Sequence, residues 1–321
     1  MKLKHLFTAL LALTTFAAPV ATHAAESYPG RPVRLIIGYA PGGGSDLVGR
    51  MAGEQLTRRL GGVVVVENIA GAAQNIAAAR VAQSAPDGHT ILMSTPALTI
   101  NPWMYKETGY KLEGFAPVAL FGQAPNALVI PATAGINTPA DLVGALKAKR
   151  TGNFSSAGFG TTHHLSGELF KQITGLDFLE HVPYKSAAEA LTAALRNDVQ
   201  LTFVSVPSAK GLAGSDKVRI LGLTGSEKST LMTGVPMLSD VGLEGMDIGT
   251  WYGLLVAAGT SAPIVNRINA AVNSDNADFA AKLAGVGVDN VRMSPQMFEA
   301  FLKADLPRWG KLLEKIHFER Q

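Results

Sequence analysis

Cysteine is absent from this 321-residue chain, and several other features are scarce. Without cysteine the chain has no disulfide scaffold and no thiol nucleophile, although its composition remains compatible with an oxidising compartment. No apolar run after residue 24 reaches the roughly 18 to 20 residues that a membrane-spanning helix needs. Lys and Arg nearly balance Asp and Glu, at 28 against 25, and no basic cluster contains interleaved aromatic residues. The sequence therefore has no signature of nucleic-acid binding.

Motifs of common hydrolases are missing as well. The chain contains no Gly-x-Ser-x-Gly elbow and no His-Glu-x-x-His motif. Ser156 and His164 lie close in sequence, but a catalytic triad also needs an orienting acid, and Glu168 fits better as a local helix partner of His164. We therefore expect no enzymatic activity, no catalytic residue and no cofactor. The alternative to a protein without enzymatic activity is a secreted hydrolase.

The first 24 residues have the three parts of a secretory signal peptide. A basic start, Met1 to His5, precedes an apolar run from Leu6 to Ala21 and a small-residue site that ends at Ala24. We predict cleavage after Ala24 and export to the periplasm. The mature chain of 297 residues has lost Lys2 and Lys4, which lowers the formal net charge from +3 to +1.

Short β-branched runs alternate with helical patterns along the rest of the chain. This rhythm predicts an α/β fold with mostly parallel sheets covered by helices on both faces. The length suits two lobes, each with its own core. We place lobe 1 at residues 25–123 and 250–321, and lobe 2 at residues 124–249. The clearest predicted strands cover residues 33–38, 63–66, 90–93, 127–130, 201–204, 219–222 and 252–256, and the first helical stripe consists of Leu47, Val48, Met51, Leu56 and Leu60.

A glycine-rich turn follows the first predicted strand and leads into a helix that we place near Leu47. The turn consists of Ala40, Pro41, Gly42, Gly43, Gly44, Ser45 and Asp46. Glycine lets the backbone approach a ligand closely, and a helix start offers unpaired N–H groups and partial positive charge. The turn is therefore a candidate anion site, with an ordinary tight connection as the alternative. We read Asp46 as a helix cap, with contact to a ligand ammonium group as a second reading.

Two later turns have the same character. The segment 155–162 runs into a second helix and offers hydroxyl groups and backbone amides from Ser156, Gly158, Gly160, Thr161 and Thr162. The segment 182–187 contributes the Tyr184 hydroxyl and the Ser186 helix start, which belongs to a Ser-x-x-Glu capping box. Such turns lie at the carboxyl ends of strands, where open α/β sheets bind ligands.

Adjacent His163 and His164 do not predict a metal site. Consecutive helical residues point about 100° apart, no third His stands at ligand spacing, and we read Glu168 as a local helix partner of His164. We expect one histidine to face the turn and the other to be solvated or packed.

Several segments, in this order, resemble the Bug-type extracytoplasmic solute-binding receptors of tripartite tricarboxylate transporters. The resemblance covers essentially the whole mature chain. It rests on Tyr28 to Val33, the glycine turn ending at Asp46, Val66 to Asn68 with Gly71, Ala72 and Asn75, Ala85 to Gly88, Phe115 to Val118, Gly158 to Glu168, Val182 to Lys185, and Trp251 with Gly259 and Thr260.

This resemblance implies a two-lobed periplasmic binding protein of the second topological type, which closes on a small mono-, di- or tricarboxylate, including aromatic ones. The implied partners are the ligand and the membrane permease subunits of the transporter, and we expect a monomer. Carried over residue by residue, the ligand site comprises the first and second turns, Tyr184 to Ser186, and Ser205. The alternative is a ligand-sensing receptor that docks on a membrane signalling protein instead of a permease.

The chain departs from the family pattern at positions that bear on the ligand. The family often has a glycine-rich segment where this chain has Ala73 to Ala77, so Gln74 adds a bulky amide near the cleft. His163 stands where the residue is usually small, Ser186 replaces a usual glycine and Gln200 a usual acid. These departures leave the receptor role in place but not a particular ligand.

Overall fold

The structure, a computed structural model, describes residues 28–212, 216–225, 232–273, 277–316 and 318, so the predicted signal peptide lies outside the described residues. Its helices and strands alternate as expected for an α/β protein. They are β1 (Val33–Ile37), α1 (Gly44–Leu60), β2 (Val64–Asn68), α2 (Asn75–Ala82), β3 (Thr90–Ser94), α3 (Ala97–Met104), β4 (Phe115–Pro131), α4 (Pro139–Lys149), β5 (Gly152–Ser156), α5 (Thr162–Thr174), β6 (Leu179–Pro183), α6 (Ala187–Leu195), β7 (Leu201–Ser205), α7 (Val206–Lys210), β8 (Val218–Leu223), β9 (Gly249–Ala257), α8 (Ala262–Asn273), α9 (Ala277–Gly285), β10 (Asp289–Asn290) and α10 (Pro295–Lys315).

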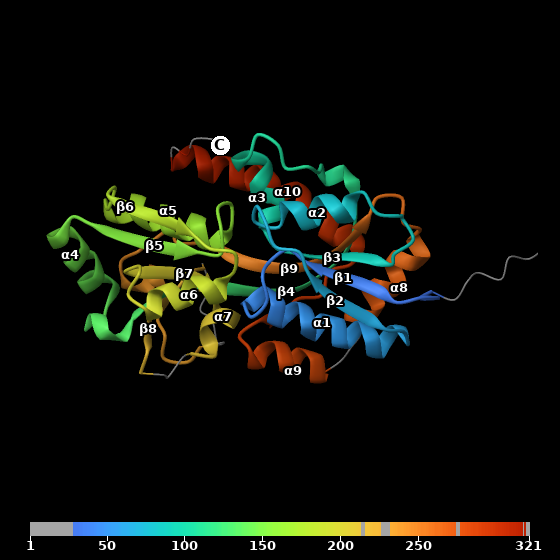
Figure 1. Cartoon of the computed structure of the whole chain (residues 1–321), viewed down its shortest axis with the longest axis horizontal. Helices are drawn as coiled ribbons and strands as arrows, with labels where there is room; N and C mark the ends of the chain where they lie inside the picture. The colour runs from blue at the N-terminus through green and yellow to red at the C-terminus, as the bar shows by residue number, and fades with distance from the viewer. Residues whose placement is uncertain (1–27, 213–215, 226–231, 274–276, 317, 319–321) are drawn as a thin grey trace, which may run out of the picture.

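The strands are arranged in two halves that share their central strands (Figure 1). The hydrogen-bonded order is β2-β1-β3-β9-β4-β7-β5-β6, with β8 and β10 also paired to β4. The outer strands are parallel, since β1 pairs with β2 and β3, and β5 pairs with β6 and β7. The central strands β9 and β4 run antiparallel to their neighbours. Each half is thus a parallel β/α unit, and antiparallel strands join the two units.

Strand β4 is the main connection between the halves. Its residues 115–125 pair with β9, and its residues 126–131 pair with β7 and β8. Only residues 127–130 of this 17-residue strand are recognisable from the sequence. Pro117 and Pro125 interrupt the β-branched pattern, and register shifts follow Pro117 and Leu120. Proline within a strand is typical of such irregular positions, which explains why the strand is hidden in the sequence.

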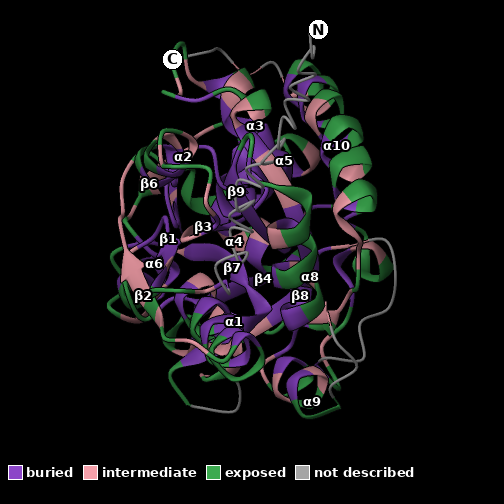
Figure 2. Ribbon diagram, turned by 90° about the vertical axis from the view of Figure 1, so that its right-hand side faces the viewer, coloured by how far each residue is buried: buried purple, intermediate pink, exposed green. Residues whose placement is uncertain are grey.

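Helices cover both faces of the sheet, and Figure 2 shows buried strands between helices whose outer faces are exposed. Helix α1 packs against the first half through one row of residues four apart, Val48, Ala52, Leu56 and Leu60. Leu47 was predicted to belong to this row, but it is 37% exposed. The helix starts at Gly44, three residues earlier than expected. Leu47 is exposed because it lies about 100° around the helix from Val48, at the edge of the buried row.

The C-terminal helix α10 contacts both halves. Phe298 and Leu302 near its start pack with first-half residues. Trp309 and Leu313 near its end belong to a cluster that contains Phe154 and other second-half residues as well as Ile100 and Met104 of the first half. Asp305 lies between these two groups and is buried. Its Oδ2 accepts hydrogen bonds from Thr99, Trp251 and Trp309 at 2.6, 3.2 and 2.9 Å. Because a buried carboxylate needs such partners, this cluster fixes the middle of α10 on the first half.

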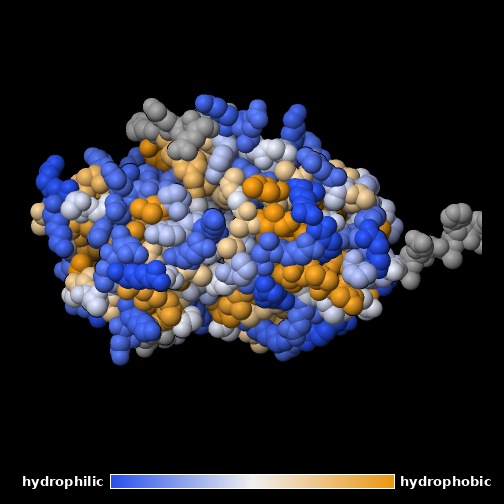
Figure 3. Space-filling view, in the orientation of Figure 1, coloured by the Kyte–Doolittle hydropathy of each residue, from blue (hydrophilic) through white to orange (hydrophobic). Residues whose placement is uncertain are grey.

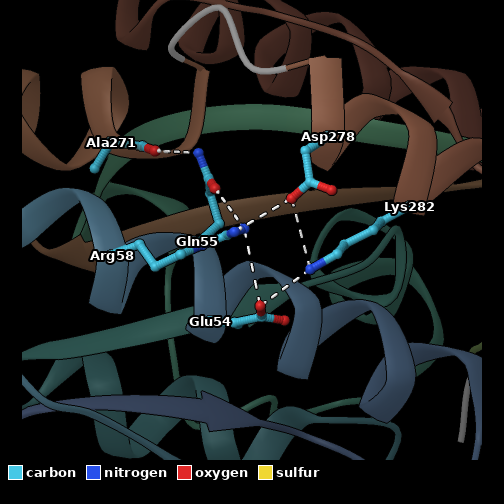
Figure 4. A network of polar contacts seen from close by, with 6 residues as sticks. All are labelled: Glu54, Gln55, Arg58, Ala271, Asp278 and Lys282. Atoms are coloured by element: carbon cyan, nitrogen blue, oxygen red, sulfur yellow. Dashed lines mark hydrogen bonds and ion pairs between the residues drawn. The ribbon is translucent and has the colours of Figure 1, made fainter.

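Polar contacts fasten the far end of α1 to the helices that follow β9. Figure 4 shows Arg58 and Glu54 of α1 beside Asp278 and Lys282 of α9. Arg58 Nη1 lies 3.2 Å from Asp278 Oδ2, and Lys282 Nζ lies 3.0 Å from Glu54 Oε1. Buried Gln55 donates to the carbonyl of Ala271 at 3.1 Å. The network orients the helix whose N-terminus is the first glycine turn.

The surface is mixed in character. On the face shown in Figure 3, apolar residues form small groups among hydrophilic ones. Strand β2 lies at one edge of the sheet, and Val63 and Val65 beside and within it are more than 40% exposed, at 59% and 43%. Within the described residues, none of the helices combines the length and the apolar character that crossing a bilayer requires.

Candidate functional site

The parallel strands of both halves direct their carboxyl ends toward the junction, and a cavity lies there. Residues after β1 and β3 face residues after β5, β6 and β7 across it. Its lining is mostly backbone, hydroxyl groups and small side chains: Tyr39, Gly43, Gly44, Ser45, Thr95, Ala157, Thr161, Thr162, His163, Ser186, Ala187, Ser205, Ser208 and Thr250. Seven of the predicted ligand-binding residues are in this set: Gly43, Gly44, Ser45, Thr161, Thr162, Ser186 and Ser205.

The other predicted residues lie around this cavity instead of on its wall. Gly158 and Tyr184 line an adjoining chamber of about 240 Å³, which shares Tyr39 and Ala157 with the cavity. Pro41 and Tyr184 border an outer depression. The remaining ones, Ala40, Gly42, Asp46, Ser156 and Gly160, build the turns themselves.

The first turn presents the N-terminus of α1 to the cavity without a side-chain cap. Gly43 is the N-cap residue, and no side chain bonds the N–H groups from that position. The positive φ of the turn belongs to Gly42, at 89°, whereas Gly43 has φ −83°. Gly44 allows close contact with the other half, because an added Cβ would lie 2.6 Å from the Ser208 Oγ. The Gly44 N–H donates to that hydroxyl at 2.8 Å.

Asp46 directs its charge away from the cavity. Its Oδ2 accepts from the Gly42 N–H at 3.1 Å and from Arg50 at 3.0 Å, and its Oδ1 accepts from Asn68 at 2.9 Å. Burial raises the pKa of Asp46, but the hydrogen bonds from Arg50, Gly42 and Asn68 outweigh it and hold the pKa below its ordinary value. The carboxylate therefore shapes the turn and leaves the helix N-terminus to an anion.

The second turn satisfies most of its own backbone groups. The Gly158 N–H donates to Ser156 Oγ at 3.1 Å, and the Gly160 N–H donates to His164 Nδ1 at 3.4 Å. Thr161 caps α5 by accepting from the His164 N–H at 3.2 Å. The two glycine amides, which the sequence offered as ligand donors, are thus engaged within the turn. Side chains at the start of α5 are what this turn presents to the cavity.

The third turn and the β7 end complete the wall. Ser186 caps α6 by accepting from the Glu189 N–H at 3.3 Å, while Glu189 accepts from the Lys185 N–H at 3.2 Å. The predicted capping box is thus present, with the return bond one residue earlier than the usual one. Ser205 is the last residue of β7, and its Oγ lies 3.2 Å from that of Ser208.

Several cavity residues were missed by the sequence reasoning, and Tyr39 with Thr95 is the clearest pair. Their hydroxyls are 2.9 Å apart. Gln74 helps to position Thr95, because its Oε1 accepts a hydrogen bond from the Thr95 N–H at 3.3 Å. Gln74 is buried with φ 69°, so its amide supports the wall rather than filling the cleft. Pairing of β3 with β1 sets Thr95 beside Tyr39, a relation that no local motif signals.

The cavity wall carries no formal charge. Among its described lining residues there is no Lys, Arg, Asp or Glu. A carboxylate there would be held by hydroxyls, backbone N–H groups and the helix dipole of α1, all of which are favourable to anions.

The free space in the cavity is about 20 Å³, which is room for about one water molecule. Direct bonds join the two halves around it, such as Tyr105 Oη to the Phe159 carbonyl at 2.9 Å. A ligand therefore needs the halves to separate.

The two adjacent histidines are both buried and have different surroundings. His164 stacks on His181 with ring centroids 4.0 Å apart and faces the turn, as expected for one of the pair. Burial lowers the pKa of His164 below its ordinary value and that of His181 to about 2. His163 is packed, not solvated, and lines the cavity. Over the described residues, no three His, Asp or Glu side chains gather as metal ligands would.

Two β/α units joined by shared central strands, with helix N-termini facing a closed interlobar cavity, define a periplasmic binding protein. The solved structure titled "Structure of periplasmic binding protein BugD" has a TM-score of 0.88 and 27% identity, covering 92% of this chain and 100% of that one. A structure of Rpa4515 from R. palustris with adipate also has a TM-score of 0.88, with 28% identity and the same coverage. MatC from Rhodopseudomonas palustris with bound malate has a TM-score of 0.82 and 27% identity, covering 89% of this chain and 100% of that one.

The sequence relationship extends over nearly the full length. The "UPF0065 protein in tcbD-tcbE intergenic region" of Pseudomonas sp. (strain P51) is 30% identical over 311 residues, which cover 94% of this chain and 91% of that protein. The family model for the tripartite tricarboxylate transporter family receptor matches residues 48–318. The chain belongs to this receptor family, and the Bug-type resemblance drawn from its motifs is confirmed.

Proposed function

We propose that this chain captures a small carboxylate between its two lobes and delivers it to the permease of a tripartite transporter, without changing it chemically. The observation that carries the proposal is the N-terminus of α1, which has no cap from its own N-cap residue and opens into an uncharged wall of hydroxyl groups. Such a wall favours an anion that can accept several hydrogen bonds. The adipate and malate complexes of related proteins support the same class of ligand.

The proposed ligand site keeps the predicted turn residues and adds wall residues. Gly43, Gly44, Ser45, Thr161, Thr162, Ser186 and Ser205 would contact the ligand, together with Tyr39, Thr95 and Ser208. Ala40, Pro41, Gly42, Asp46, Ser156, Gly158, Gly160 and Tyr184 would shape the turns or the adjoining chamber. The chamber of about 240 Å³ gives a longer carboxylate room to extend.

The proposed lobes are residues 25–123 with 250–321, and residues 124–249. Support comes from β4, which changes partners from β9 to β7 and β8 between Pro125 and Asn126. Helix α10 would hold the lobes together at one side while the cleft opens, since its two ends pack on different lobes. Export through cleavage after Ala24, and a periplasmic location, are part of the same proposal.

Isothermal calorimetry of the mature chain tests the function. The panel would be acetate, succinate, malate, adipate, citrate and benzoate, with the corresponding amides as controls. We expect micromolar or tighter binding of at least one carboxylate and no heat with its amide. Proton NMR of the mixture over a day should show the ligand unchanged, and appearance of a product would contradict a receptor. Loss of labelled-ligand uptake in a deletion strain would connect binding to transport.

A further inference from the structure

His163 is the one lining residue with an imidazole, and its position in α5 places it in the wall. It is the second residue of the helix and is only 7% exposed. Its Nε2 accepts a hydrogen bond from the backbone N–H of Ser205 at 2.9 Å. Its Nδ1 is buried and has no hydrogen-bond partner among the described residues.

These two contacts determine where the imidazole proton is. An Nε2 that accepts from a backbone N–H has no proton of its own, so the neutral ring must carry its proton on Nδ1. Burial supports the neutral form, because it lowers the pKa of His163 to about 3. The ring is then held with a single N–H donor, and a buried donor without an acceptor is costly.

We propose that the Nδ1–H of His163 donates a hydrogen bond to a carboxylate oxygen of the ligand, and that the Ser205 N–H holds the ring in this tautomer. The proposal rests on the proposed function and adds a specificity-determining residue to it. The donor is neutral and belongs to the second residue of α5, in the N-terminal turn where a negative charge is favoured. An ammonium group at the same place would meet a donor where it needs an acceptor, so this contact disfavours an amine.

A matched pair of variants separates this role from a structural one. In His163→Asn, the side-chain NH₂ can take the place of the Nδ1–H, but the acceptor for Ser205 is lost. In His163→Gln, the amide oxygen can take the place of Nε2 and accept from Ser205, but the donor at Nδ1 is lost. Calorimetry with malate and adipate on both variants and the wild type reports the effect, and thermal unfolding without ligand reports folding.

We expect His163→Gln to weaken binding by roughly ten- to a hundredfold, as for loss of one hydrogen bond to a charged group, with His163→Asn nearer to wild type. The opposite order would overturn the proposal, because His163 would then act only by holding Ser205. Wild-type affinity in both variants would overturn it too. If the wild type binds no carboxylate of the panel, the proposed function fails and the His163 contact fails with it.

The tautomer gives a second measurement that does not depend on the variants folding. Long-range ¹H–¹⁵N correlation spectra of wild-type protein labelled at histidine distinguish Nδ1–H from Nε2–H. We expect His163 to be Nδ1-protonated at pH 7 and its Nδ1–H signal to move when malate or adipate is added. An Nε2-protonated ring, or a signal that ignores a bound ligand, would overturn the proposal even if both variants bind weakly.

Discussion

The first and second turns face the cavity from opposite lobes, and they use the same kind of helix start in different ways. At the first, Gly43 provides no side-chain cap, and Asp46 is turned away by Arg50 and Asn68. At the second, Thr161 caps the helix and the amides of Gly158 and Gly160 are already bonded. The first turn therefore presents a helix start that has no cap from its own N-cap residue, although its Gly44 N–H is bonded to Ser208 of the other lobe, and the second turn presents side chains. Glycine content alone does not distinguish a ligand cradle from a closed structural turn.

The largest expected effect comes from Gly44→Val at the first turn. An added Cβ would lie 2.6 Å from Ser208 Oγ and 2.7 Å from Ser205 Oγ, so closure of the cleft and the hydrogen bond from the Gly44 N–H to Ser208 would both be blocked. We expect malate or adipate affinity to fall at least about a hundredfold, as for more than one lost hydrogen bond. Gly144→Ala in α4 is the control, since its Cβ meets nothing within 4 Å. Unchanged affinity in a folded Gly44→Val protein would reduce the first turn to a plain connection.

Acid should destabilise the second turn through His163. Its folded pKa of about 3 lies below the ordinary value of 6.5. Between these two values the unfolded chain is protonated at His163 and the folded chain is not. The contribution of neutral His163 to the free energy of unfolding is therefore present above pH 6.5 and is lost as the pH falls toward 3. At pH 5 the loss of stability through His163 amounts to about 2 kcal/mol. Urea unfolding at pH 7 and pH 5 should show wild type losing that much more than His163→Gln. Equal losses would mean that His163 is protonated in the fold.

Thr161→Val tests the side-chain cap that the first turn lacks. The substitution keeps the shape but removes the acceptor for the His164 N–H and the donor to the Gly158 carbonyl. We expect the free energy of unfolding to fall by about 1 kcal/mol, with Thr161→Ser close to wild type. Chemical denaturation measures it. Equal stability of the valine and serine variants would show that the second turn needs its cap no more than the first does.

The smallest effect should come from the far end of α1. Lys282→Ala removes ion pairs to Glu54 and Asp278, all at exposed positions. Such pairs contribute less than about 1 kcal/mol, and the loss should diminish in salt. Affinity for malate or adipate should not change. A clear loss of binding would mean that the orientation of α1, and not only its N-terminal residues, limits the first turn.

Local signals were sufficient for much of the fold and for half of the site. The alternation of β-branched runs and helical stripes predicted the α/β class, and the turns at Gly43, Thr161 and Ser186 all reach the cavity. The same signals missed β4, because Pro117 and Pro125 break its pattern. They also assigned Leu47 to the buried face of α1, since Leu47 and Val48 are both apolar and the sequence does not show that the buried row runs through Val48.

Sequence alone determined the class of chemistry available here: no thiol, glycine and hydroxyl residues at helix starts, and a family pattern over the whole mature chain. Those properties are local, because they depend on residue type and on spacing within one turn. Tertiary structure decided which of the offered donors remain to bind a ligand. Thr95 reaches Tyr39 only through the pairing of β3 with β1, and His163 becomes a neutral donor only because β7 brings the Ser205 N–H to its other nitrogen. His163 and Ser205 are 42 positions apart, and neither segment alone predicts their contact. This contact decides that the proton of the neutral imidazole is on Nδ1.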